Sequence, residues 1–217
     1  MKPSLLRPLT LLLCLPWLAG CLSSVLPEAE QTELYQFPPS RLTAGTAAPS
    51  PALVVERPTA IAALEGDRLL AIVSSGEVQR VGNARWVGDP AGLVQDALIE
   101  RLRQLQAASS VDRNALRLGP AWRLQGELRA LHYQPDRDQA SVELMLHLIC
   151  PGHGSLGQRR FRADVQPAAR APDAIVLGLA EGLDQIAVDV AHWLASSRSE
   201  CAPAEAGSAD SLESRGD

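Results

Sequence analysis

Residues 121–150 read AWRLQGELRALHYQPDRDQASVELMLHLIC, and this stretch decides the fold. In its first half, apolar side chains recur on one face: Trp122, Leu124, Leu128 and Ala130. In its second half, the alternate positions are again apolar: Ala140, Val142, Leu144, Leu146 and Leu148. A period of two is typical of a strand that is covered on one side only. With a turn at residues 135–138, the pattern predicts two long antiparallel strands.

The opposite face of these two strands carries mainly polar side chains. They are Arg123, Gln125, Glu127, Arg129, Ser141, Glu143, Met145 and His147. A protein that carries lipid inside itself needs a large apolar cavity. This face instead predicts a surface that meets solvent or a partner.

Shorter strands and two helices complete the predicted fold. Strands are predicted at residues 33–37, 52–57, 67–73, 77–81 and 157–165, with a hairpin turn at residues 74–76. Helices open at Asp89-Pro90 and Pro172-Asp173, and both have apolar stripes at three- and four-residue steps. On the first helix, the predicted outer face carries Asp96, Glu100, Arg101 and Arg103. The fold class is therefore α+β, in two layers: an antiparallel sheet with two amphipathic helices on one face.

The N-terminus has the layout of a secretory signal. Lys2 and Arg7 precede an apolar run of about ten residues, too short to span a ~30 Å hydrocarbon core. The run ends in Leu18-Ala19-Gly20-Cys21, which resembles the lipobox of bacterial lipoproteins. The resemblance implies cleavage before Cys21 and acylation of that cysteine, and several acyl chains give stable anchoring. The alternative is an ordinary signal peptide followed by a chance cysteine.

These features divide the chain into four parts. We expect a signal peptide at residues 1–20, a lipidated tether at 21–32, an α+β domain at 33–196 and a disordered polar tail at 197–217. Position 22 is leucine, whereas aspartate there retains enteric lipoproteins in the inner membrane. That sorting rule favours the periplasmic side of the outer membrane over the inner membrane.

The charge and the cysteines narrow the functional class. A net charge of -5 without a basic block argues against nucleic-acid binding. After cleavage and acylation, the remaining thiols are those of Cys150 and Cys201. The periplasm is oxidising, so this pair is a candidate disulfide, with two free thiols as the alternative.

The sequence offers no catalytic constellation. The four histidines, His132, His147, His153 and His192, are scattered, and Cys150 and His153 lack the further spaced ligands of a zinc site. Asp136 and Asp138 are interpreted as turn residues that bond the local backbone. We therefore expect a protein without enzymatic activity, metal or cofactor.

Several short motifs follow the lipobox in an order and spacing that resemble a known family. They are residues 34–37 (LYQF), 53–58 (LVVERP), 64–69 (LEGDRL) and 84–86 (ARW), followed by Asp89-Pro90. Over residues 33–195 the chain resembles the ABC-type transport auxiliary lipoprotein family, the lipoprotein components of MCE-type and paraquat-inducible lipid transport systems. Val87-Gly88 departs from the family pattern, where an alanine is expected before Asp-Pro.

The resemblance implies an accessory role. The expected partners are a periplasmic MCE-domain protein and an inner-membrane ABC transporter, which together move lipids or other hydrophobic molecules between the membranes. Self-association into a homo-oligomer is a further expectation. The alternative is an outer-membrane biogenesis or lipid-carrier lipoprotein that is unrelated to an ABC transporter.

Four residues are candidates for a partner interface. Arg85 and Trp86 belong to types that are enriched at interface hot spots, but Trp86 could equally pack under the helix that follows while Arg85 pairs at its edge. Tyr35 and Phe37 lie on a predicted strand that could pair with a partner, or they could fill the core.

Overall fold

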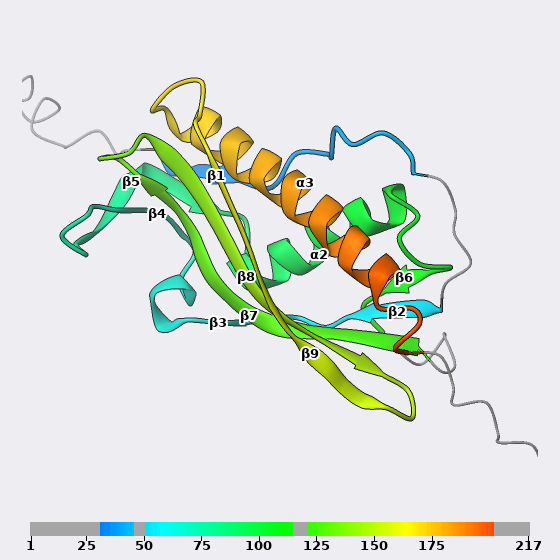
Figure 1. Cartoon of the computed structure of the whole chain (residues 1–217). Helices are drawn as coiled ribbons and strands as arrows, with labels where there is room; N and C mark the ends of the chain where they lie inside the picture. Colours follow the sequence, from blue (N-terminus) through cyan, green and yellow to red (C-terminus); the bar gives the residue numbers. More distant parts are fainter. Residues whose placement is uncertain (1–30, 46–50, 115–120, 202–217) are drawn as a thin grey trace, which may run out of the picture. The chain divides into compact units, whose positions relative to one another are not determined.

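The computed structural model describes residues 31–45, 51–114 and 121–201, and the description below concerns the unit that begins at Glu33. Its strands are β1 (Glu33–Tyr35), β2 (Ala52–Val55), β3 (Thr59–Ala60), β4 (Arg68–Ile72), β5 (Val78–Trp86), β6 (Val111–Asp112), β7 (Ala121–Gln134), β8 (Gln139–Cys150) and β9 (Gly154–Val165). Its helices are α2 (Pro90–Gln104) and α3 (Pro172–Ser196), and η2 (Ala62–Leu64) is a short 3-10 helix (Figure 1).

Strand β7 organises the sheet. Along one side it pairs antiparallel with β8, which in turn pairs with β9. Along its other side it pairs in parallel with β2, β3 and β4 in succession, so that Ala52 lies opposite Ala121 and Leu70 opposite His132. Residues 52–72 thus follow β7 as one interrupted strand. Beyond them, β5 pairs antiparallel with β4, β1 pairs in parallel with β5, and β6 pairs in parallel with β2.

The sheet is therefore mixed, and the prediction of a purely antiparallel sheet is wrong. The hairpins β4–β5, β7–β8 and β8–β9 are antiparallel, the first two as predicted from their turns. The parallel pairs join segments that are far apart in the chain, and a local pattern carries no signal for such pairing. Two short strands, β3 and β6, lie in segments that were not predicted to be strands.

A bulge in β7 reverses the faces of its second half. The register with β8 shifts between Leu128 and Ala130. A one-residue shift moves each following side chain to the other face. Leu131 consequently joins the core, whereas Ala130 pairs opposite Glu143 and is absent from the core cluster. The strict alternation in the sequence had placed Ala130 on the core face, and that prediction is wrong.

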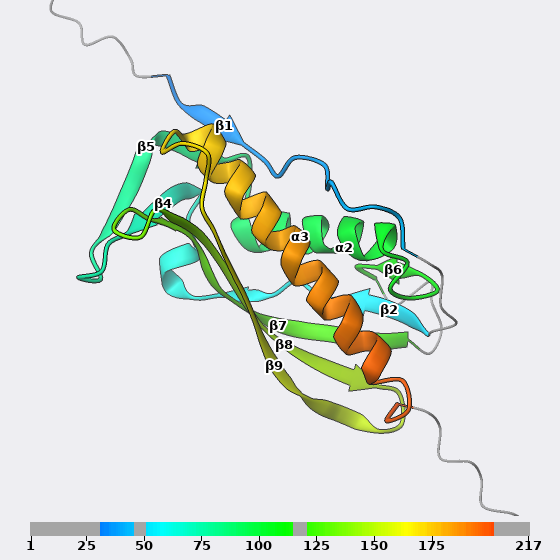
Figure 2. The ribbon, with the colours of Figure 1, turned by 45° about the horizontal axis from the view of Figure 1, so that its top comes forward.

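Both helices lie on the same side of the sheet, as predicted (Figure 2). The Asp89 carboxylate accepts a hydrogen bond from the backbone N–H of Gly92 at 2.6 Å and caps α2, with Pro90 as its first residue. The apolar stripe of α3 is buried against the sheet at Ile175, Leu179, Leu183, Ile186, Val190 and Leu194. The core fills the space between the two layers.

The described chain continues past the predicted end of the domain at residue 196. Ser197 and Cys201 are both buried, and the backbone N–H of Cys201 donates to the carbonyl of Ser197. Residues 197–201 are therefore part of the folded unit rather than of a disordered tail.

Candidate functional site

The predicted signal peptide and Cys21 lie outside the described residues. Acylation of Cys21 and cleavage before it accordingly stay predictions from the sequence. Within the described parts of the chain, neither helix is long and apolar enough to cross a membrane.

Trp86 belongs to the core and not to an exposed recognition patch. Only 2% of its surface is exposed, and its ring packs against that of Phe37, with the ring centroids 4.9 Å apart. It ends β5, three residues before Asp89 caps α2. The structure therefore favours the packing interpretation over the interface interpretation for Trp86 and for Phe37.

Arg85 is held at the edge of this core by an ion pair. Its guanidinium lies 3.1 Å from the Asp67 carboxylate, and both side chains are partly exposed. The backbone N–H of Trp86 donates to the Asp67 carbonyl at 2.6 Å, so Asp67 bonds both residues. Arg85 thus has a structural partner within its own domain, as the packing interpretation expects.

Tyr35 lies on β1, which pairs with β5 and with no other strand in the described part of the chain. Its hydroxyl donates to the Glu33 carboxylate at 2.5 Å, and mainly this bond raises the pKa of Tyr35 to about 12. The phenol is therefore protonated at neutral pH. The neighbouring Leu34 points the other way and is 63% exposed. Of the four predicted interface residues, Tyr35 is the one that lies on an edge strand and remains partly accessible.

The outer face of β8 and β9 carries a neutralised charge network. The Arg162 guanidinium lies 3.1 Å from the Glu143 carboxylate and 2.9 Å from that of Asp164. Asp164 also accepts a hydrogen bond from the Ser141 hydroxyl at 2.5 Å. The hydrogen bonds from Arg162 are the main reason why the pKa of Asp164 lies below its ordinary value. This face is polar, as predicted, but its charges are largely satisfied internally.

His132 lies beside this charge network. It is 8% exposed, and burial, with the positive charge of Arg162 second, lowers its pKa below 6.5. Its Nε2 atom lies 3.3 Å from the amide nitrogen of Gln134. Within the described residues, no group of three or more histidine, cysteine, aspartate or glutamate side chains could hold a metal ion.

A cleft of about 550 Å³ lies between α3, residues 38–41 and residues 166–168. Leu177 contributes an exposed apolar side chain to its lining. Arg101 and Asp184 also line it, with the Nε of Arg101 2.6 Å from the Asp184 carboxylate. Apolar and charged groups therefore share this cleft.

Arg101 is the principal residue that sequence reasoning misplaced. It was assigned to the solvent face of α2, yet the residue has 0% of its surface exposed. Its guanidinium donates to Asp184, to the Ala97 carbonyl at 3.1 Å and to the Ala180 carbonyl at 3.3 Å. It thereby links α2 to α3. An arginine and an aspartate more than eighty residues apart give no sequence signal of pairing.

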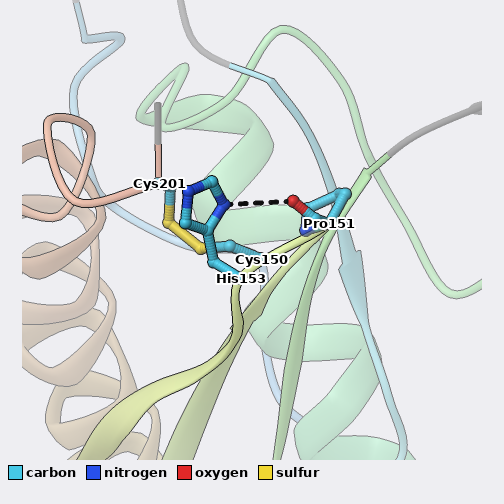
Figure 3. Close-up of a disulfide and its surroundings, with 4 residues drawn as sticks. All are labelled: Cys150, Pro151, His153 and Cys201. Atoms are coloured by element: carbon cyan, nitrogen blue, oxygen red, sulfur yellow. Dashed lines mark hydrogen bonds between the residues drawn. A yellow bond between two sulfur atoms is a disulfide. The ribbon is translucent and has the colours of Figure 1, made fainter. Parts of the chain in front are cut away.

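Cys150 and Cys201 form a disulfide in the structure (Figure 3). Their Cα atoms are 5.6 Å apart, and 51 positions separate them in the chain. The bridge attaches the segment after α3 to the end of β8. Its neighbour His153 is exposed, and its Nδ1 lies 3.4 Å from the Pro151 carbonyl.

Two aspartates in the β7–β8 turn make longer-range contacts than predicted. Asp136 accepts a hydrogen bond at 2.6 Å from the backbone N–H of Ser74, in the β4–β5 turn. Asp138 accepts from the Tyr133 hydroxyl and pairs with Arg170 at 3.3 Å. These carboxylates join separate parts of the fold and do not serve only their own backbone.

Comparison with known proteins supplies the functional class. The family model described as the ABC-type transport auxiliary lipoprotein component matches residues 35–191. No curated protein matches the sequence. A crystal structure of an uncharacterized protein is similar, with a TM-score of 0.64 and 19% identity over 76% of this chain and 99% of that one. A Xanthomonas campestris protein of the DUF330 family has a TM-score of 0.64 and 17% identity over 77% of this chain and 98% of that one. These two structures share the fold with this chain.

Proposed function

This chain belongs to the ABC-type transport auxiliary lipoprotein family, and on that premise we propose that it is the membrane-anchored accessory component of an MCE-type system. The system would move lipids or other hydrophobic molecules between the inner and outer membranes. In this proposal the domain contributes surfaces and a fixed position, while the ABC transporter supplies the energy.

The filled interior of the domain carries the proposal. The inward side chains of β8, from Ala140 to Leu148, are buried against the helices, as is the stripe on α3. Among the described residues, buried apolar side chains of both layers form one packed cluster. This arrangement supports a connecting or docking part more than a carrier with cargo inside it. Under the alternative, a lipid carrier, the mixed cleft beside Leu177 is the candidate place for an acyl chain.

The proposed location is the periplasmic side of the outer membrane, with the lipid on Cys21 as the anchor. Separation of the two membranes should recover the protein with the outer membrane. A Leu22→Asp variant should shift it to the inner membrane if the sorting rule applies. Recovery of the unaltered chain with the inner membrane would refute the proposed location while leaving the accessory role untouched.

Photo-crosslinking tests the proposed partner. A photoreactive amino acid at Leu34, which is exposed on the edge strand β1, should crosslink in cells to an MCE-domain protein. The matched control places the same amino acid at Arg137, in the exposed β7–β8 turn. Tyr35, also on β1, and the exposed Leu177 of α3 serve as second and third positions. The proposal fails if none of the three yields an MCE-domain protein above the control.

Native mass spectrometry separates the two functions. The full chain, extracted gently from membranes, should appear without bound lipid other than its own acyl chains. A stoichiometric additional phospholipid would favour the carrier alternative. Genes for an MCE protein and an ABC permease next to this gene would support the accessory role.

A further inference from the structure

Strand β9 is the long open edge of the sheet. It has twelve residues and, among the strands that the structure describes, pairs only with β8, whereas the terminal strands β1 and β6 have three and two residues. An edge strand exposes backbone donors and acceptors, which proteins often protect by shortening the strand, by charged side chains, by proline or by a bulge. The β9 sequence GSLGQRRFRADV contains no proline, and its register shift lies near its start, opposite Leu148 and Ile149, which leaves a regular ladder from Gln158 to Val165. Its charged side chains repel a like-charged strand but attract one of opposite charge. Its backbone is therefore a template on which another strand can form.

The arginines of β9 give this edge a positive charge. Arg162 is neutralised by Glu143 and Asp164. Arg159 and Arg160, in contrast, are exposed, and neither has an ion-pair partner among the residues that the structure describes. Successive side chains of a strand point to opposite faces. An added strand would therefore meet, on each face of the sheet, one guanidinium that has no ion pair among the described residues.

The second half of β9 packs against α3. Phe161, Ala163 and Val165 are buried on the helix side, and the Phe161 ring packs against Trp193 of α3, with the centroids 5.5 Å apart. The Arg159 guanidinium lies over the Phe161 ring at 5.5 Å from its centroid. A strand that is already ordered pays little conformational entropy on binding. Trp193 is only partly buried, and tryptophan and arginine are the residues most enriched at interface hot spots.

We propose that the free edge of β9 binds an extended acidic segment of a partner protein by strand addition, with carboxylates of that segment paired to Arg159 and Arg160. Main-chain hydrogen bonds supply affinity in this mode, and the alternate side chains supply specificity. The local positive charge is distinctive because the chain as a whole carries a net charge of -5. The proposal does not depend on the transport role.

A defined peptide tests this binding mode. The probe is a fluorescent ten-residue peptide that alternates valine and glutamate, and its partner is the full mature chain. Fluorescence anisotropy should show saturable binding, and Arg159→Glu/Arg160→Glu should weaken it by about tenfold or more. Arg137→Glu, a charge reversal in an exposed turn, should leave the affinity within about twofold. A peptide that alternates valine and lysine should not bind.

Hydrogen exchange distinguishes strand addition from simple charge attraction. Amides of β9 should gain protection when the acidic peptide binds, while those of β5 should not. Absence of binding, equal binding by the double variant, or binding without added protection in β9 would each overturn the proposal.

The chain's own C-terminal segment is the competing occupant. It contains Glu205, Asp210, Glu213 and Asp217, and it follows Cys201, which is bridged to Cys150 at the start of the β8–β9 turn. A chain that ends at Cys201 should bind the peptide as tightly as the full chain does. If the truncated chain instead binds the peptide with an affinity at least tenfold higher, the chain's own C-terminal segment occupies the edge, and the partner proposal is overturned.

Discussion

Replacing Asp184 with alanine should be among the most destabilising single changes on the surface of α3. Asp184 accepts a hydrogen bond from the buried Arg101 guanidinium at 2.6 Å and one from the backbone N–H of Arg41 at 3.3 Å. The substitution leaves Arg101 buried with two backbone carbonyls as its remaining partners. Those carbonyls carry no compensating charge, so the folded state keeps an uncompensated cation.

The expected cost follows from the burial of the arginine. A hydrogen bond to a charged group contributes about 1.5–3 kcal/mol, and removal of one partner of a buried ion pair costs about 3–5 kcal/mol. Asp184 retains some exposure, so water reaches that end of the pair. We therefore expect the free energy of unfolding to fall by about 3 kcal/mol.

Urea unfolding with linear extrapolation measures this change. The matched control is Asp96→Ala, which removes a helix-interior aspartate that pairs with Arg113 on the surface and should cost less than about 1 kcal/mol. Adding Arg101→Met to Asp184→Ala removes the stranded charge and should restore most of the loss. The reasoning is refuted if Asp184→Ala costs no more than Asp96→Ala, or if the second substitution restores nothing.

Three further predictions follow from local features. Gly126→Ala should lower the free energy of unfolding, measured in urea, by about 1–3 kcal/mol, because a Cβ at this position would lie 2.2 Å from the Met145 carbonyl oxygen. Gly66→Ala is the control and should be nearly neutral, because no atom lies within 4 Å of the added Cβ. Burial lowers the pKa of His132, so near and below pH 6.5 the unfolded chain binds more protons than the folded chain. The contribution of His132 to the free energy of unfolding is therefore complete above pH 6.5 and is lost as the pH falls below it. His132→Gln should flatten this pH dependence, and an unchanged slope of stability against pH would contradict the assignment. Thiol titration of the denatured, unreduced mature chain should detect no thiol from the Cys150–Cys201 pair, and reduction should lower stability by about 2–4 kcal/mol.

Local patterns predicted the elements well because each carries its own signal. The alternation in β8, the turns at residues 74–76 and 135–138, and the Asp89-Pro90 start of α2 all correspond to observed features. In β7 the alternation predicted the first half but not the second. The bulge at Arg129 reverses the faces while both Ala130 and Leu131 are apolar, so composition could not reveal the shift.

Long-range pairing was beyond the reach of the sequence pattern. The parallel contacts of β2, β3 and β4 with β7 depend on which segments meet, and so does the pairing of Arg101 with Asp184. The same limit applies to the candidate site. Trp86 and Arg85 have the residue types of an interface, yet the structure uses them to join β5 to the core and to Asp67. The open edge of β9 emerged only once the order of the strands was known.

The central place of β7 also bears on how the chain folds after export. Residues 52–72 take their parallel pairing along β7 from a strand that begins at Ala121, so before β7 is available β4 can pair only with β5 and β2 only with β6 among the described strands. Parallel, non-local pairing is slow to form because a long loop must close first. For a chain that the predicted signal peptide directs through a translocation pore, this delay would keep the first half of the domain open during passage. The complete sheet can therefore form only once β7 is present.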